Sequence, residues 1–209
     1  MSHHIYTTPG FIVLSRPYGE SGKFFLIFTR DLGMIGATAQ GVRLSQSKLR
    51  YHIQDYSYGL FSLVRGKEVW RLTGAKDIAR EGSKDVTGDM IGQKIVSSES
   101  KKLHVRVLSL LKRLLHGEEK NERLFEIIHA FYTFLDRENS SEGNDILGEL
   151  IEYVTVLRIL HCLGYISNKN DFGDLVSDSV INEKILDKVK SLKSKIVKEI
   201  NNALKESQL

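Results

Sequence analysis

The chain has 209 residues, of which 41% are hydrophobic and 27% are charged, and its formal net charge is +4. This composition excludes an intrinsically disordered protein and favours one large or two small folded domains. No apolar run approaches the ~18 residues of a membrane-spanning helix, so we expect no membrane association. Cys162 is the single cysteine, which excludes an intrachain disulfide and a cysteine-rich zinc site.

The charge is distributed unevenly along the chain. Residues 1–80 hold 11 Lys and Arg against 5 Asp and Glu, whereas residues 81–209 hold 19 against 21. A basic N-terminal module on a nearly neutral body predicts an anionic partner. The first residues, MSHHIYTTPG, lack the basic and apolar regions of a secretory signal, and we therefore expect a cytoplasmic protein.

The N-terminal part has the pattern of strands. Five short runs rich in aromatic and β-branched residues are separated by turn signals, at 10–15, 23–29, 34–42, 56–64 and 68–73. RDLG (30–33) predicts a hairpin loop, and Gly66-Lys67 predicts a type II′ turn. Gly36 and Gly59 predict bulges or sharp bends. With a polar, partly helical link at 43–55, the pattern predicts an OB-fold barrel, and an SH3-like barrel is the competing interpretation.

The pair Gly22-Lys23, within RPYGESGKFFLIFTR, is not a phosphate-binding loop. That motif needs a glycine five residues before Gly22 and a hydroxyl after the lysine, but Pro17 and Phe24 occupy these positions. The stretch after Lys23 is also typical of a strand rather than a helix. In a barrel, Gly19 and Gly22 would permit a turn, and Lys23 would supply a positive charge to a sugar-phosphate backbone.

The C-terminal part has a helical period. Apolar residues recur every three to four positions over about 103–115, 124–135, 145–163 and 185–200. Gly117 and Gly164 are predicted to end the first and third helices, and Asn121 to cap the second. The third helix is apolar around most of its circumference and is expected at the centre of the bundle. The predicted fold class is therefore α+β, with a nucleic-acid-binding barrel (1–80), a connection (81–98) and an all-helical domain (81–209).

The order of these features resembles the RecO family of bacterial recombination mediators. The resemblance is carried by GFIVLSRPYGESGKFFLIFTRDLGMIGATAQGVR (10–43), VWRLTGA (69–75), LLKRLLHGEEKNERLFEIIHAFYTFL (110–135) and LRILHCLGY (157–165). Many members of that family have zinc-binding cysteines after the last segment. This chain has none there, and we expect no metal and no cofactor.

The resemblance implies a DNA repair protein that is not an enzyme. Such a protein binds single- and double-stranded DNA, anneals complementary strands and assists recombinase loading, together with a RecR-type partner and the tail of single-stranded-DNA-binding protein. It would be cytoplasmic and associated with the nucleoid. The cations expected to bind nucleic acid are Arg16, Lys23, Arg30, Arg43, Lys48, Arg50 and Arg71. Lys112 and Arg113 are expected to bind the acidic, hydrophobic tail, beside the exposed ends of apolar rows.

The aromatic side chains of the N-terminal part are assigned to two roles. Tyr18 and Tyr51 are the expected stacking residues, whereas Phe24, Phe25, Phe28 and Phe61 are assigned to the core. The side chains of His161 and Cys162 are adjacent on a helix and diverge by about 100°, so they do not form a catalytic pair.

An RNA-binding OB-fold module with a helical partner-binding domain is the alternative function. A hydrolase or transferase with a cleft between barrel and bundle is a third.

Overall fold

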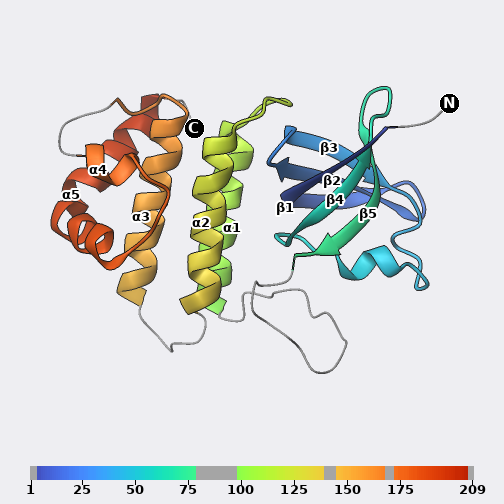
Figure 1. Ribbon diagram of the computed structural model, residues 1–209, viewed down its shortest axis with the longest axis horizontal. Helices are drawn as coiled ribbons and strands as arrows, with labels where there is room; N and C mark the ends of the chain where they lie inside the picture. Colours follow the sequence, from blue (N-terminus) through green and yellow to red (C-terminus); the bar gives the residue numbers. More distant parts are fainter. Residues whose placement is uncertain (1–3, 79–97, 139–144, 168–171, 207–209) are drawn as a thin grey trace. The chain divides into compact units, whose positions relative to one another are not determined.

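A computed structural model of the protein contains a five-stranded barrel followed in the chain by helices (Figure 1). It describes residues 4–78, 98–138, 145–167 and 172–206, so most of the predicted connection (81–98) lies outside the described residues. The chain divides into two compact units. The barrel unit is residues 1–94 with the segment Leu114–Glu122, and the helical unit is residues 95–113 with 123–209.

The strands form a closed barrel in the order β1-β2-β3-β5-β4. Neighbouring strands are antiparallel except β3 and β5, which are parallel. A 3-10 helix, η1 (Lys48–Tyr51), lies in the link between β3 and β4. The five strands are β1 (Ile5–Tyr18), β2 (Gly22–Thr29), β3 (Gly33–Ala39), β4 (Tyr58–Val64) and β5 (Trp70–Asp77). This OB-like architecture confirms the predicted fold class.

The first strand closes the barrel because it pairs with two partners. Residues Ile5–Phe11 pair with β4, and residues Gly10–Tyr18 pair with β2. Gly10 lies where the partner changes, and a Cβ atom there would be 2.9 Å from the carbonyl oxygen of Phe28. A glycine is therefore required at this position, because any side chain would collide with the backbone of β2.

The two glycines predicted to mark bulges or sharp bends do not lie at bulges, and one predicted turn was wrong. Gly36 and Gly59 lie in regular register, and the irregularities fall between Ile12 and Leu14 in β1 and opposite Ser62 and Leu63 of β4. The connection from β4 to β5 covers residues 65–69, and Gly66 does not have the positive φ that a type II′ turn requires. The predicted RDLG hairpin is confirmed, since β2 and β3 pair up to Thr29 and Gly33.

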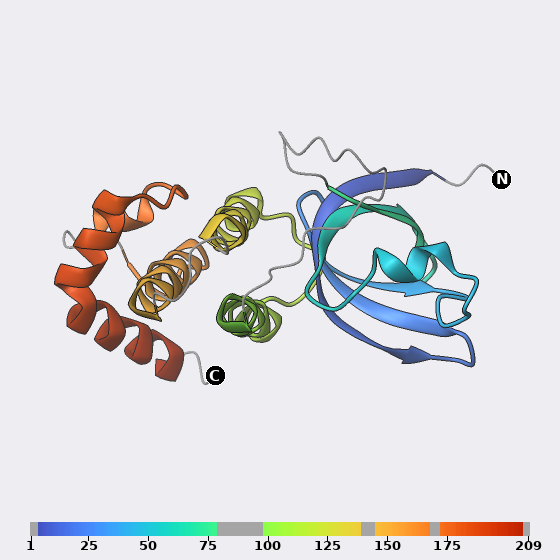
Figure 2. The ribbon, with the colours of Figure 1, turned by 90° about the horizontal axis from the view of Figure 1, so that it is seen from below.

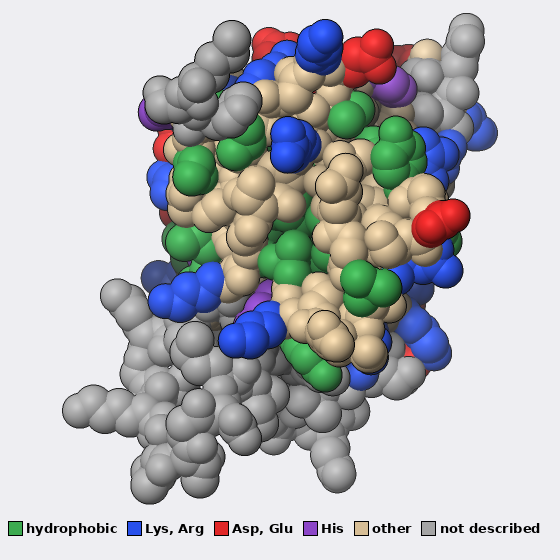
Figure 3. All heavy atoms as spheres, turned by 90° about the vertical axis from the view of Figure 1, so that its right-hand side faces the viewer, with side chains coloured by type: hydrophobic (Ala, Val, Ile, Leu, Met, Phe, Trp, Pro, Cys, Tyr) green, Lys and Arg blue, Asp and Glu red, His purple; other side chains and the backbone are tan. Residues whose placement is uncertain are grey.

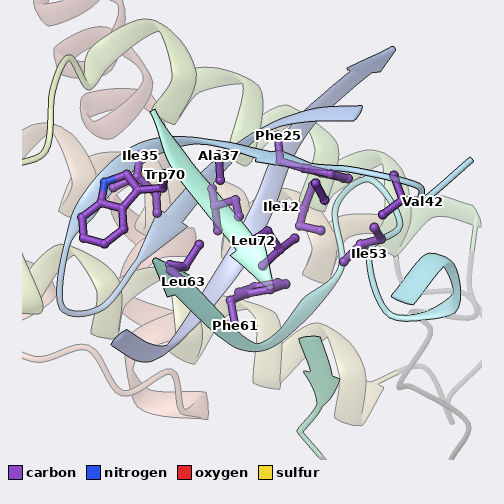
Figure 4. Close-up of a cluster of buried hydrophobic side chains, with 12 residues drawn as sticks. Ile12, Phe25, Ile35, Ala37, Val42, Ile53, Phe61, Leu63, Trp70 and Leu72 are labelled. Carbon is purple, nitrogen blue, oxygen red and sulfur yellow. The ribbon is translucent and has the colours of Figure 1, made fainter. Parts of the chain in front are cut away.

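The barrel interior is filled by side chains from all five strands and from the link between β3 and β4 (Figure 4). Strand alternation explains the set, because residues at every second position point inward. Phe25 and Ile27 of β2 are fully buried in this way. The labelled members are Ile12, Phe25, Ile35, Ala37, Val42, Ile53, Phe61, Leu63, Trp70 and Leu72.

The helical unit has α3 at its centre, as predicted. Figures 1 and 2 both show α3 between α2 and α5. Leu150, Ile151, Val154 and Leu160 of α3 are buried, as its apolar circumference requires. The helices are α1 (Ser98–Leu114), α2 (Glu122–Glu138), α3 (Asp145–Cys162), α4 (Gly173–Val176) and α5 (Glu183–Glu206). The short α4 was not predicted, because it lies in a polar stretch without a helical period.

Gly164 ends α3 in the predicted manner. Its φ is +83°, its N–H donates to the carbonyl of His161 (3.0 Å), and the N–H of Tyr165 donates to Leu160 (2.9 Å). These two bonds form a Schellman motif. Gly117 also has a positive φ of +93°, but it lies three residues beyond the end of α1. It turns the following segment and does not cap the helix.

Candidate nucleic-acid interface

A basic hollow lies at one end of the barrel. Its volume is about 450 Å³, and Val42 and Ile53, which also belong to the barrel core, line part of it. Lys23 comes from the start of β2, Arg43 follows β3, and Arg50 lies on η1. The complete lining is Lys23, Val42, Arg43, Arg50, Tyr51, Ile53 and Gln54. We call Lys23, Arg43, Arg50 and Tyr51 the mouth surface.

The loop that joins β1 to β2 is fastened to this end of the barrel. The backbone N–H of Arg43 donates to the carbonyl of Ser21 (3.0 Å), and its Nη1 donates to the carbonyl of Glu20 (3.1 Å). Gly19, with a φ of +63°, turns the loop. Arg43 therefore connects the segment after β3 with the loop that contains RPYGESGK. Lys48, at the start of η1, is close to Arg43 and Arg50 in the sequence, and its side chain is exposed.

A second group of side chains lies on the outside of the same strands. Arg16 of β1 is in register with Phe24 of β2. Phe24 is in register with Thr38 of β3, and Thr38 with Arg71 of β5. Residues in register on neighbouring strands point to the same face of a sheet. The Cζ atom of Arg16 is 4.8 Å from the centroid of the Phe24 ring, within the range of a cation–π interaction. We call these four residues the outer-face row.

Phe24 corrects one expectation about the core. Phe25, Phe28 and Phe61 are buried as predicted, but Phe24 is only half-buried and faces outward. The signal was in the sequence, because neighbouring residues of a strand point to opposite faces and Phe25 is fully inward. Of the two predicted stacking residues, Tyr18 is 58% exposed and Tyr51 is 66% exposed. Gln54, which lines the hollow, had no sequence signal.

Six of the seven predicted cations have no carboxylate partner in the part of the chain that the structure describes. These are Arg16, Lys23, Arg43, Lys48, Arg50 and Arg71. All are exposed except Lys23, which is half-buried and donates to Ser15 Oγ (3.3 Å). Figure 3 shows one side of the barrel, on which Lys and Arg side chains border hydrophobic ones and acidic side chains are few. Their charges can therefore interact with an external anion.

Arg30 is placed differently from the other predicted cations. Lys23 lies at the start of β2, whereas Arg30 directly follows the end of this strand. Arg30 forms an ion pair with Glu122 (2.8 Å). The hydrogen bond from Arg30, with the charge of Lys120, holds the pKa of Glu122 below its usual value. Arg65 pairs likewise with Glu118, which also accepts a hydrogen bond from Trp70 Nε1 (3.0 Å). The structure therefore does not bring Arg30 together with the mouth surface or the outer-face row.

Lys112 and Arg113, the predicted tail-binding residues, lie in the last turn of α1. Both side chains are exposed. The neighbouring Leu111 and Leu114 are buried, so those two leucines do not provide the exposed apolar row that we expected beside the charges. Lys112 and Arg113 therefore place exposed positive charge here, next to the half-buried Leu110 and Leu115.

The described residues contain neither a metal-binding cluster nor a membrane-spanning helix. Within them, no group of three or more His, Cys, Asp and Glu side chains could hold a metal ion. Residues 168–171, which follow the segment LRILHCLGY (157–165), are outside the described part. Among the helices described, none combines the length and apolar character needed to cross a bilayer.

Comparisons with known proteins agree on one family. Residues 1–80 match the family model "Recombination protein O N terminal". The chain is 34% identical over 132 residues to "DNA repair protein RecO" of Alkaliphilus metalliredigens, covering 59% of this chain and 54% of the relative. It is 26% identical over 143 residues to the protein of that name from Halalkalibacterium halodurans, covering 68% and 51%. The chain thus spans about half the length of these relatives.

Proposed function

Since this chain belongs to the RecO family of DNA repair proteins, we propose that its barrel binds single- and double-stranded DNA and anneals complementary strands. Annealing needs no bond chemistry, and the protein then acts without being an enzyme. Cations that neutralise phosphates on two strands reduce the repulsion between them. A surface that binds the backbone weakly and releases it readily is sufficient for this activity.

One observation carries the proposal. Six predicted cations have no carboxylate partner within the described residues, while Arg30 and Arg65 of the same barrel are paired with Glu122 and Glu118. Two of these cations lie against aromatic rings, Arg16 over Phe24 and Arg50 beside Tyr51. Cations for phosphates together with aromatic faces for bases are the combination that single-strand binding uses.

The helical unit supplies the protein contacts in this proposal. Lys112 and Arg113 are exposed at the end of α1 and would pair with the acidic tail of single-stranded-DNA-binding protein. Displacement of single-stranded-DNA-binding protein from DNA, together with a RecR-type partner, would assist recombinase loading indirectly. The protein would act in the cytoplasm on the nucleoid. A pull-down against single-stranded-DNA-binding protein with and without its tail, using Lys112→Ala/Arg113→Ala, tests this contact.

The DNA-binding proposal is tested by replacing Arg43, Lys48 and Arg50 together with Ala. We expect weaker binding and slower annealing for all DNA sequences, because backbone contacts carry no base information. The slope of log K against log salt should flatten by about 0.7 for each lost phosphate contact on a single strand. Fluorescence anisotropy and an annealing assay measure both effects.

The matched control removes the same charge from the helical unit. Lys184, Lys190 and Lys198 are exposed on α5, and their replacement by Ala should leave DNA binding nearly unchanged. Equal losses in both triple variants would mean that overall charge, and not this surface, attracts DNA. Competition with RNA oligonucleotides of the same sequence tests the RNA-binding alternative, which a preference for RNA would support.

A further inference from the structure

The mouth surface and the outer-face row lie on opposite sides of the same hairpin. Lys23 of the mouth surface and Phe24 of the outer-face row are consecutive residues of β2. Consecutive strand residues point to opposite faces of a sheet. Lys23 accordingly has the inward parity of the buried Phe25 and lines the hollow, whereas Phe24 contacts Arg16 outside. The backbone of β2 therefore separates the two surfaces.

Each surface has its own cations and its own aromatic ring. In the mouth surface, the Cζ atom of Arg50 is 5.8 Å from the centroid of the Tyr51 ring, beside Lys23 and Arg43. In the outer-face row, Arg16 covers Phe24, and Arg71 lies two strands further on. Three inter-strand spacings separate Arg16 from Arg71, which makes the row roughly 14 Å long. Each surface can hold a short stretch of backbone with a base on an aromatic face.

The tip of the hairpin is unfavourable for a strand that would pass from one surface to the other. Glu20 is exposed in the loop between β1 and β2, and the backbone carbonyl oxygens of Gly19 and Glu20 lie toward Arg43. A carboxylate at this point repels phosphates. The arrangement thus favours two strands on two surfaces over one strand wrapped around the hairpin.

We propose that the barrel has two separate strand-binding surfaces, one on each side of the β1–β2 hairpin, so that one copy of the protein holds two DNA strands at once. The mouth surface holds one strand and the outer-face row holds the other. This inference rests on the proposed DNA-binding function and adds the number and location of the bound strands. Annealing then becomes a reaction between two strands on one barrel.

The test counts bound oligonucleotides. An oligothymidylate of about four nucleotides, at the lower end of the site sizes of OB folds, is short enough to occupy one surface. Native mass spectrometry or sedimentation with a labelled oligonucleotide should show two molecules bound to each protein chain at saturation. The double variant Arg43→Gln/Arg50→Gln should bind one oligonucleotide, on the outer-face row. The double variant Arg16→Gln/Arg71→Gln should also bind one oligonucleotide, on the mouth surface. Each double variant should anneal complementary strands about tenfold more slowly or worse, because it retains one strand only.

The outcomes separate this inference from the proposed function. Saturation of the unchanged protein at one oligonucleotide would overturn the two-surface arrangement while leaving DNA binding intact. No binding at all would overturn the proposed function itself. Two oligonucleotides on either double variant would show that its surface is not a binding site. Circular dichroism and melting temperature confirm that the variants are folded, and Lys184→Gln/Lys190→Gln on α5 is the charge-matched control that should still bind two.

Discussion

At the scale of single residues, Arg158 is a charged side chain buried in the helical unit. It lies on α3, is 2% exposed, and donates to the carbonyl oxygens of Leu175 (2.7 Å), Ser179 (2.9 Å) and Val180 (3.0 Å). Burial lowers the pKa of Arg158 to about 10, opposed by the charge of Asp178. The guanidinium remains protonated at neutral pH, and it fastens the segment around α4 to the central helix.

Replacing Arg158 with Met should destabilise the protein by about 3 kcal/mol or more, because buried carbonyl oxygens lose their donors. Urea unfolding, followed by circular dichroism, measures the change. Arg137 is exposed in the last turn of α2, and Arg137→Met should change stability by less than ~0.5 kcal/mol. Similar stability of the two variants would show that the three hydrogen bonds contribute little.

At the scale of elements, β1 decides whether the barrel closes. Its 14 residues extend beyond the predicted run at both ends, because the strand pairs first with β4 and then with β2. The exchange of partners occurs at Gly10, whose partner on β4 is also a glycine, Gly59. A Cβ atom at Gly59 would be 3.0 Å from the carbonyl oxygen of Lys76. The two glycines allow β1 to approach β2 and β4 to approach β5 closely at this point.

Gly10→Ala should destabilise the barrel by about 1–3 kcal/mol, because the new methyl group would be forced against the Phe28 backbone and the side chains of Ile27 and Phe61. Thermal unfolding measures the change. Gly173→Ala is the matched control, since a Cβ atom at Gly173 in α4 meets nothing within 4 Å. A melting temperature for Gly10→Ala equal to that of the control would mean that β1 can shift to admit the methyl group.

At the scale of the whole molecule, the proposed function depends on which positive charges are available to DNA. The first 80 residues hold 11 Lys and Arg against 5 Asp and Glu, but part of this charge is neutralised within the barrel unit. The segment Leu114–Glu122 brings Glu118 to Arg65 and Glu122 to Arg30. The cations that remain without a carboxylate partner include those of the mouth surface, Lys48 and the outer-face row.

Single-strand affinity should therefore fall steeply with salt. If roughly four to seven phosphates are neutralised, the slope of log K against log salt should be about −3 to −5. Anisotropy titrations at several salt concentrations, with a single-stranded oligonucleotide, measure it. A flat response would contradict an interface built on phosphate neutralisation.

Most of the fold follows from local sequence patterns. The period of two in the first 78 residues and the period of 3.6 after residue 100 depend on neighbours in the chain, so they predict the strands, the helices and the central place of α3. The Schellman motif at Gly164 is local as well. The short α4 lacks such a pattern, because its polar flanks resemble a loop. Its position depends on Arg158, which comes from another helix.

The sequence by itself determined that this chain is a basic barrel joined to a helical bundle, because strand alternation, helical period and charge can be read over short distances. Only the tertiary structure decided which cations are available to a ligand. Arg30 and Arg65 are paired with carboxylates 92 and 53 residues away, and no local pattern contains such pairs. The same holds for the outer-face row, because the register of four strands brings Arg16, Phe24 and Arg71 together through space.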